Sequence, residues 1–547
     1  MKKLTEIFSL RGCVMFHFAF WLFFVLGFCA NISKSVIEGS VASWLLTPLV
    51  TAFLAGAMAL PTLISKSKAY KRVYIVAVSV LLTLLIAMEF FLMTEFSIFC
   101  GQDVIDILYE TNGDESSEFL ATYMSFGKIV LYVIGMVTVW ALSFLLAKYI
   151  VQRRYAVYAE CLLAGGGVIV MAVCVIGFIK YRNGMSIPQY SSPTRILYSM
   201  YVADRRAETN RELCGECASY IQTAGEKSRN RGLNVILVIG ESHSYYHTPA
   251  YGYGINTFPL VGSIADSTLV WYDDIVTVSD HTQGAMDAIF PMNIPEGPTV
   301  LFPAVFKALG YKTAMYDNQY LAGNGISILS DGGISDLLYD VRNKTRVPDL
   351  ELVRNGIAPD SANTMVIYHL MGSHYKYEER YPRDKFSVFG PDDYPGYGRD
   401  EAEILAHYDN SLRYTDYVLK SVMDKYADKN SVMVYISDHG EEVFDIDGYM
   451  GHGNAYSRSR PEYQIRVPMF IWMSEGYMAS YPDKRDAIRR NSGKPGLTSG
   501  IGHLLLDLAN EAESRYRPQR SIVHGSYEKP RRVVLNSLDF DEACAKK

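Results

Sequence analysis

The chain has 547 residues and a formal net charge of −6, and 49% of its residues are hydrophobic. A chain of this length exceeds what a single hydrophobic core usually supports, so at least two domains are expected. The charge is spread over the chain without a concentrated basic face, and this distribution excludes a nucleic-acid-binding protein.

Five apolar stretches in the first third of the chain are long enough to cross a bilayer, which takes about 20 helical residues each. They span approximately residues 12–30, 42–64, 73–94, 129–147 and 156–179. The first stretch is longer than the core of a secretion signal and lacks a cleavage site, so we interpret it as a retained anchor. We therefore predict an N-terminal bundle of five transmembrane helices.

The Lys and Arg residues that flank these stretches predict their orientation, because positively charged loops stay in the cytoplasm. Such residues are frequent before the first stretch, between the second and third, and between the fourth and fifth. The loop at about residues 96–127 instead carries six acidic residues and no Lys or Arg. With five spans, everything after about Lys180 is predicted to lie outside the cytoplasm.

Glu89 lies within the third stretch, where a carboxylate is costly and often has a functional or bundle-facing role. It is close to the outer end, so we favour the simpler interpretation that it reaches the membrane interface. After the last stretch, Ser192 and Pro193 are typical of a helix start, and an amphipathic segment follows them. We predict that this segment is a connector helix along the membrane surface.

Cys214 and Cys217 form a C-x-x-C pair after this segment. A local disulfide is the favoured interpretation, and half a metal site or two free thiols are the alternatives. No second C-x-x-C follows, so a structural zinc ribbon is not expected.

From Leu233 onward, short β-rich apolar runs alternate with helical stretches, which predicts a sheet covered by helices on both faces. Three of the runs end in polar residues suited to chemistry: Glu241 and Ser242 follow the first, Ser373 and His374 the second, and Asp438 and His439 the third. Ligands bind beyond the carboxyl ends of the strands in open α/β sheets. We therefore expect these three strand ends to form one site.

Two carboxylates and an imidazole, from Glu241, Asp438 and His439, suit zinc and leave a coordination position for a hydroxyl group. Thr282 begins a predicted helix and is a candidate for both the fourth ligand and the nucleophile, since backbone amides at the helix start can receive a phosphoryl oxygen. Each residue also has a simpler interpretation, because an Asp-His pair often caps a turn and a threonine often caps a helix. Spacing alone does not decide between them.

At these positions the sequence resembles the phosphoethanolamine transferases of the alkaline phosphatase and sulfatase superfamily, including those that modify lipid A. The similarity covers nearly the whole chain. It rests on Asn-Val-Ile-Leu-Val-Ile-Gly-Glu-Ser at 234–242, His-Leu-Met-Gly-Ser-His at 369–374, Ser-Asp-His-Gly-Glu at 437–441 and Gly-His-Gly at 451–453.

This resemblance implies an α/β sulfatase-like domain with a central mixed sheet between helices, behind the five transmembrane helices. We assign residues 1–180 to the five-span transmembrane domain, 181–232 to a periplasmic connector with an interfacial helix, and 233–547 to the periplasmic catalytic domain. The protein is then expected in the bacterial inner membrane, as a multi-pass monomer.

The resemblance also implies the roles of the site residues. Glu241, Thr282, Asp438 and His439 are expected to hold one tightly bound zinc ion, and a second ion remains open. Thr282 is the expected nucleophile, with His374 and His452 as further catalytic residues. Substrate binding is expected at His374, His452 and Asn318.

The implied reaction is a zinc-dependent transfer of phosphoethanolamine from phosphatidylethanolamine to lipid A or another cell-envelope glycan, through a phosphothreonine-type intermediate. A phosphoglycerol transferase or a phosphodiesterase of the same superfamily is the alternative, and a non-catalytic protein that binds a glycolipid is a third hypothesis. A sulfatase is not expected, because Thr282 is followed by Gln283, Gly284 and Ala285 rather than by the Pro and Arg of the formylglycine motif.

Overall fold

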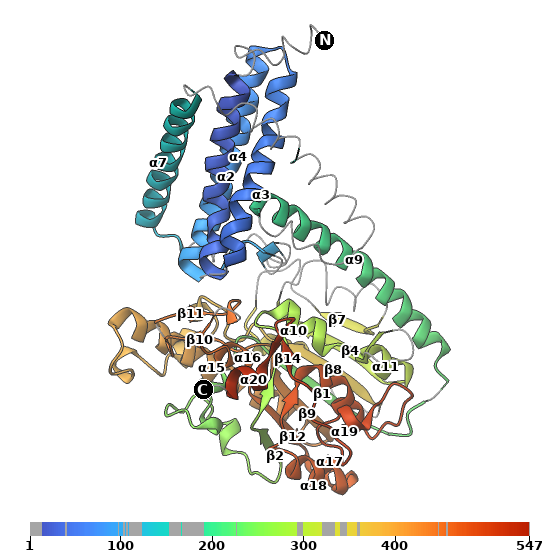
Figure 1. The fold of residues 1–547 in the computed structure, drawn as a ribbon. Coiled ribbons are helices and arrows are strands. Elements are labelled where there is room, and N and C mark those ends of the chain that lie inside the picture. The colour runs from blue at the N-terminus through green and yellow to red at the C-terminus, as the bar shows by residue number, and fades with distance from the viewer. Residues whose placement is uncertain are drawn as a thin grey trace. The chain divides into compact units, whose positions relative to one another are not determined.

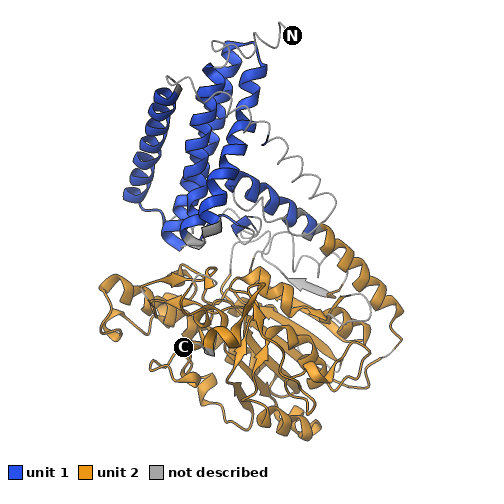
Figure 2. Ribbon diagram, viewed as in Figure 1, with its two compact units in different colours: residues 1–108, 114–205 blue, residues 109–113, 206–547 orange. Residues whose placement is uncertain are grey.

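The computed structural model of the protein describes residues 14–38, 41–96, 98–101, 104–105, 108, 123–151, 166, 191–225, 227–292, 299–319, 334–339, 347–357, 362–446, 448–455 and 458–545. The chain forms two compact units. Unit 1 comprises residues 1–108 and 114–205, and unit 2 comprises residues 109–113 and 206–547 (Figure 2).

Unit 1 is helical, and four of its described helices are long and apolar enough to cross a membrane. They are α2 (Val14–Glu38), α3 (Val41–Ile64), α4 (Lys68–Phe96) and α7 (Phe126–Val151) (Figure 1). These helices correspond to the first four predicted spans, apart from residues 12–13, which lie outside the described residues. The fifth, at 156–179, lies almost entirely outside the described residues.

Helix α2 packs against α3, α4 and α7. Its buried face carries Phe16, Phe20 and Phe23 at helical spacing, and α3 contributes the small residues Ala55 and Ala59 to the same apolar cluster. Small side chains let membrane helices approach closely. The aromatic face of α2 therefore forms the centre of the bundle.

Glu89 does not reach a solvated interface as expected. Its side chain on α4 is 1% exposed and is paired with the buried Arg195. The prediction was wrong because the partner comes from a distant part of the sequence, the start of helix α9 (Ser192–Thr223). Helix α9 does begin at Ser192, as predicted, and it runs from unit 1 into unit 2.

The disulfide favoured for the C-x-x-C pair is absent. Cys214 and Cys217 are both thiols on α9, and the Cys217 sulfur accepts a hydrogen bond from the backbone amide of Leu301. Side chains three residues apart inside a helix have Cβ atoms about 5–6 Å apart. A disulfide requires about 4 Å, so the helix keeps the two sulfurs apart.

Unit 2 contains a mixed seven-stranded sheet in the order β2-β12-β9-β1-β8-β6-β7. The strands are β1 (Leu233–Gly240), β2 (Leu269–Tyr272), β6 (Lys312–Asp317), β7 (Leu337–Tyr339), β8 (Thr364–His369), β9 (Asn430–Ser437) and β12 (Met469–Met473). The five strands from β9 to β7 are parallel, whereas β12 is antiparallel to both of its neighbours. This arrangement confirms the predicted mixed sheet.

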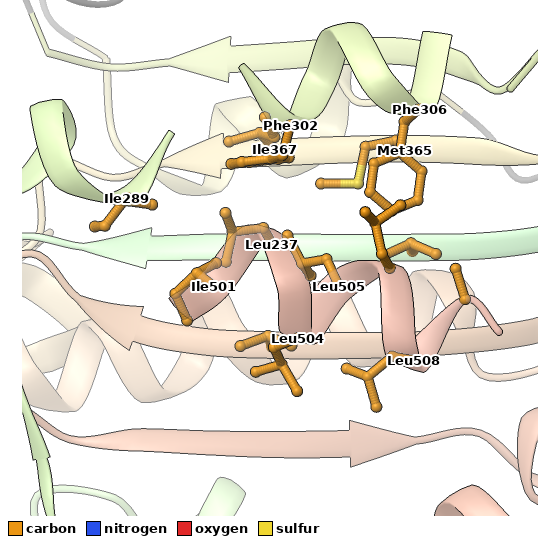
Figure 3. Packing of buried hydrophobic residues seen from close by; sticks show 14 of the residues in the cluster. Leu237, Ile289, Phe302, Phe306, Met365, Ile367, Ile501, Leu504, Leu505 and Leu508 are labelled. Carbon is orange, nitrogen blue, oxygen red and sulfur yellow. The ribbon is translucent and has the colours of Figure 1, made fainter. Parts of the chain in front are cut away.

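Helices pack on both faces of this sheet, as predicted. Leu237 of β1 lies in one apolar cluster with α10 (Thr282–Ile289), α11 (Phe302–Ala308) and α19 (Ile501–Leu508). Figure 3 shows Leu505 of α19 beside Leu237, with Leu504 and Leu508 on the side of the helix away from Leu237. The next residue, Val238, lies in the opposite cluster with α15 (Arg399–Tyr426). Alternate residues of a strand point to opposite faces, so β1 is buried on both.

Shorter elements complete unit 2. Its other helices include α13 (Leu350–Asn355), α14 (Arg383–Phe386), α16 (Glu462–Ile465), α17 (Glu475–Ser480), α18 (Pro482–Arg490) and α20 (Phe540–Ala545). Its two-stranded pairs among the described residues are β3 (Ile275–Val276) with β13 (Gly496–Leu497), β4 (Pro291–Met292) with β5 (Val300–Leu301), β10 (Glu442–Val443) with β11 (Met450–Gly451), and β14 (Val533–Val534) with β15 (Leu538–Asp539).

Candidate active site

The strand ends that carry polar residues meet at the middle of the sheet. Strand β1 lies between β8 and β9, and Ile239 is in register with both His369 and Ile436. The residues that follow these strands therefore emerge side by side. Because β1 and β9 are paired in parallel, Glu241 and Asp438, which directly follow these strands, lie next to each other.

Glu241, Asp438 and His439 form a compact buried group. Single ligand atoms of the three lie within 4.8 Å of one another. The Nε2 atom of His439 is 3.3 Å from Glu241 Oε1 and 3.4 Å from Asp438 Oδ2. All three side chains are at most 1% exposed. The three residues that were expected to share one site therefore lie together in the structure.

Thr282 joins the group from the first turn of α10. Its hydroxyl donates a hydrogen bond to Glu241 Oε2 at 3.0 Å and lies 3.4 Å from His439 Nε2. His281, the residue before it, has an extended backbone that turns the chain into the helix. The four predicted ligands therefore surround a common point.

The charges of this group act on one another. Burial alone would raise the pKa of Glu241, but the positive charge of His439 holds that pKa well below its ordinary value. Burial and the charge of Glu241 raise the pKa of Asp438. Burial opposes protonation of His439, yet the two carboxylates raise its pKa to about 10. A cation is therefore favoured among these oxygens.

His452 contacts the group from the loop after β11. Its Nδ1 atom is 2.5 Å from Glu441 Oε2, and the Tyr377 hydroxyl donates to the other oxygen of Glu441 at 2.5 Å. The rings of His452 and His439 have centroids 4.1 Å apart. The side chain of His452 is 19% exposed, so its ring is oriented by Glu441 and remains open to a substrate.

Asp280 holds the His452 loop against the Thr282 segment. Its carboxylate accepts a hydrogen bond from the amide of Ala455 at 2.8 Å, and its carbonyl accepts one from the amide of Gly453 at 3.1 Å. Asp280 lies two residues before Thr282 in the chain. The candidate nucleophile and the candidate acid or base are thus carried by two segments that are tied together.

His374 follows β8 after a tight turn at Gly372. The amide of Ser373, the residue before it, donates a hydrogen bond to the Glu241 carbonyl at 3.0 Å, so the His374 backbone lies beside the Glu241 segment. The buried Arg380 donates hydrogen bonds to the backbone carbonyls of His374 and Tyr375, each at 3.2 Å or less. The guanidinium group of Arg380 therefore fixes the backbone at His374.

The backbone around Glu241 is tightly constrained. Ser242 adopts a left-handed conformation with φ of 55°. Its hydroxyl donates to Glu241 Oε1 at 2.7 Å, and its amide donates to Asp438 Oδ1 at 3.2 Å. Strained residues of this kind are often found at functional sites. Here the strained residue, Ser242, donates one hydrogen bond to each of the two carboxylates.

Asn318, one of the predicted substrate-binding residues, forms its side-chain hydrogen bonds with the segment at residues 347–349. Its amide donates to Asp349 Oδ1 at 2.6 Å and to the carbonyl of Val347 at 2.8 Å. Asp349 in turn accepts hydrogen bonds from the amides of Met371 and Gly372. In this structure Asn318 therefore supports the turn that leads to His374.

Gln319, which was not among the predicted site residues, contacts the group directly. Its Nε2 atom donates to Glu241 Oε2 at 2.7 Å and to the carbonyl of Leu370 at 2.8 Å. The residue follows the end of β6, so the rule that revealed the other strand ends was sufficient to find it.

Two family models match this chain. The sulfatase model matches residues 233–509, about half of the chain. The model described as phosphoethanolamine transferase EptA/EptB matches residues 57–205. The two matches together cover most of unit 2 and much of unit 1.

Individual proteins agree with these models. Phosphoethanolamine transferase EptC of Escherichia coli strain K12 is 28% identical over 478 residues, which are 81% of this chain and 82% of that protein. The crystal structure of the periplasmic domain of the E. coli EptC protein in complex with Zn is 26% identical, with a TM-score of 0.50 over 58% of this chain and 94% of that one. The integral membrane protein lipooligosaccharide phosphoethanolamine transferase A of Neisseria meningitidis shares the fold at 16% identity, with a TM-score of 0.61 over 95% of this chain and 99% of that one.

Proposed function

Because this chain belongs to the sulfatase family and is a phosphoethanolamine transferase of the alkaline phosphatase superfamily, we propose that Thr282 is its nucleophile. Phosphoethanolamine is transferred from phosphatidylethanolamine to Thr282 and then to lipid A or another cell-envelope glycan. The observation that carries the proposal is the Thr282 hydroxyl, which lies 3.0 Å from Glu241 within the buried ligand group.

The chemistry of the donor set fits zinc. Among the described residues, Asp438 Oδ2 is buried without a hydrogen-bond partner, as expected of an oxygen reserved for a metal ion. We assign Glu241, Thr282, Asp438 and His439 as its ligands. The choice of zinc is supported by the similar E. coli EptC domain, whose structure is a complex with Zn. When bound, zinc would lower the pKa of the threonine hydroxyl and offset the charge of the carboxylates. A second ligand group, His439 with Glu441 and His452, leaves the number of ions open.

In the first step, Thr282 Oγ1 attacks the phosphorus of the donor. A bond forms between Oγ1 and phosphorus, and the bond from phosphorus to the diacylglycerol oxygen breaks. The hydroxyl hydrogen of Thr282 is directed at Glu241 Oε2 and passes to that carboxylate as the bond to phosphorus forms. His452, oriented by Glu441, delivers a proton to the departing oxygen of diacylglycerol.

In the second step, a hydroxyl or phosphate oxygen of the acceptor attacks the same phosphorus. The bond between phosphorus and Thr282 Oγ1 breaks, and Thr282 regains its hydrogen from Glu241. His452, now neutral, accepts the proton of the acceptor. His374, which follows the end of β8 beside the Glu241 segment, binds the phosphoryl oxygens in both steps. Ping-pong kinetics should follow from the covalent intermediate.

The membrane unit suits a donor and an acceptor that are both lipids. We propose a multi-pass protein of the bacterial inner membrane, with residues 1–180 in the bilayer, 181–232 as a connector and 233–547 in the periplasm. The loop charges described above and the four candidate spans support this layout. Confinement to one membrane raises the encounter rate of enzyme, donor and acceptor.

Mass analysis of the intermediate tests the proposal. Full-length protein incubated with labelled phosphatidylethanolamine should yield a tryptic peptide that carries phosphoethanolamine on Thr282, together with free diacylglycerol. Thr282→Ala should give no adduct, whereas Thr268→Ala, at a half-buried threonine of the same unit whose hydroxyl donates a hydrogen bond to the nearby Ala265 carbonyl, should react normally. Phosphoglycerol on the peptide would indicate the rival transferase, and no adduct from any phospholipid would favour a protein that only binds lipids.

A further inference from the structure

The membrane unit contains a buried ionic group that the transfer chemistry does not use. Glu89 of α4 is 1% exposed, and Arg195 of α9 is 3% exposed. Arg195 Nη2 forms an ion pair with Glu89 Oε1, and Arg195 Nε donates to the carbonyl of Cys100. All of these residues belong to unit 1.

Both carboxylate oxygens of Glu89 have two hydrogen-bond donors. Oε1 accepts from the Ser192 hydroxyl at 2.5 Å and from Arg195. Oε2 accepts from the Ser33 hydroxyl at 2.8 Å and from the amide of Cys100 at 3.2 Å. The carboxylate is therefore fully satisfied, and its donors come from α2, from the segment after α4 and from the first turn of α9.

Neighbouring contacts extend this network. Asn31 of α2 accepts a hydrogen bond from the amide of Ser192 at 2.6 Å and donates to Thr51 of α3 at 2.8 Å. The side chains of Arg195 and of Lys34 both lie over the ring of Phe99, at 4.8 and 4.6 Å from its centroid. Helices α2 and α4 thus contact the first turn of α9 through polar groups, and α3 supports this contact through the hydrogen bond between Thr51 and Asn31.

We propose that Glu89 is a positioning residue that docks the first turn of α9 onto the membrane helices. Removing one partner of a buried ion pair leaves an uncompensated charge, which is strongly unfavourable. Polar contacts of this kind also fix one register, because a shifted helix would leave several buried donors without acceptors. The network therefore sets where α9 leaves the bundle on its way to unit 2.

The consequence for catalysis rests on the proposed function. If the donor is a lipid of the same bilayer, the catalytic unit must be presented to it by α9, which connects the two units. A loosened first turn would lower the frequency of productive encounters with the lipid. A water-soluble donor would not depend on this presentation.

Hydrogen exchange of the full-length protein in nanodiscs tests the docking directly. In the wild-type protein, peptides within residues 192–205 should exchange slowly. In Glu89→Gln the same peptides should exchange at least about tenfold faster, because local opening no longer breaks an ion pair. Peptides of strand β1 should exchange as in the wild type. Glu95→Gln is the matched control, because Glu95 lies on the same helix and pairs with the surface residue Lys128.

Donor preference provides the second readout. With phosphatidylethanolamine as the donor, Glu89→Gln should transfer phosphoethanolamine with a kcat/KM about tenfold lower than that of the wild type. With a water-soluble aryl ester of phosphoethanolamine as the donor, its kcat/KM should equal that of the wild type. If Glu89→Gln does not accumulate, Ser192→Ala removes one donor and keeps the ion pair, and a smaller change in the same direction is expected.

Two outcomes would overturn the inference. One is unchanged exchange at 192–205 in Glu89→Gln. The other is accelerated exchange throughout both units with equal loss for both donors, since this would make Glu89 a general folding residue. Failure of the wild type to use phosphatidylethanolamine would contradict the proposed function alone, because the exchange comparison does not depend on the donor.

Discussion

At the scale of single residues, Gln319 should set the zinc affinity of the site. Its amide holds Glu241 Oε2 at 2.7 Å and is itself held by the carbonyl of Leu370. Residues that orient metal ligands typically contribute about 10- to 100-fold to metal affinity. Gln319→Leu should weaken zinc binding by a factor in this range, measured by competition with a chromogenic chelator on the full-length protein.

A loss of zinc affinity with an unchanged melting temperature of the metal-free protein would identify orientation as the cause. Gln319→Glu is a sharper variant, since it retains the shape but places a second carboxylate against Glu241. Zinc affinity equal to that of the wild type in both variants would contradict this role.

His247 should make the stability of unit 2 depend on pH. Burial would lower the pKa of His247, but the carboxylates of Asp445 and Asp409 raise it from 6.5 to about 10. Because folding favours the protonated form of His247, this residue makes its full contribution to the free energy of unfolding below about pH 6.5. The contribution is lost as the pH rises through about 10. The difference in melting temperature between the wild type and His247→Gln should therefore shrink steadily from pH 6 to pH 10. A constant difference would show that His247 is not charged in the fold.

At the scale of elements, the turn after β8 should tolerate no side chain at Gly372. Gly372 has φ of +48°, and a Cβ atom there would lie 2.8 Å from the carbonyl oxygen and 2.9 Å from the nitrogen of Glu241. Both atoms belong to the backbone and cannot rotate away. Gly372→Ala should thus displace Glu241. The rate of phosphoethanolamine transfer should fall by about 100-fold, because a misplacement of about 1 Å in an active site can have an effect of this size. Gly390→Ala, where a Cβ meets open space, is the control.

The same elements explain which parts of the site were predictable. Glu241 and His439 stand directly after apolar strands, and parallel pairing brings such ends together whatever lies between them. Local patterns carry no information on partners far along the chain. Gln319 is 78 residues from Glu241, and Arg195 is 106 residues from Glu89. Gln319 follows a strand end, so the strand-end rule could have located the residue but not its contact with Glu241. No pattern indicated Arg195, which turned a predicted interfacial carboxylate into a buried one.

At the scale of the whole molecule, removal of zinc should destabilise unit 2 and leave unit 1 unchanged. Each unit has its own apolar core, and the proposed ligands all belong to unit 2. Without a metal ion, the buried carboxylates Glu241 and Asp438 repel each other, which is one cause of the raised pKa of Asp438. A ligand present at 1,000 times its Kd stabilises the native state by about 4 kcal/mol. A chelator should therefore lower the melting temperature of unit 2 by several degrees.

Thermal unfolding of the full-length protein in detergent, followed separately in the two units by hydrogen exchange, measures this effect. Asp438→Asn is the decisive control, because it removes a ligand and part of the repulsion at once. Its metal-free form should unfold at or above the temperature of the metal-free wild type, and added chelator should no longer change that temperature. A chelator effect of the same size in Asp438→Asn would place the stabilising metal elsewhere in the molecule, since a site that has lost a buried ligand cannot hold zinc with the original affinity.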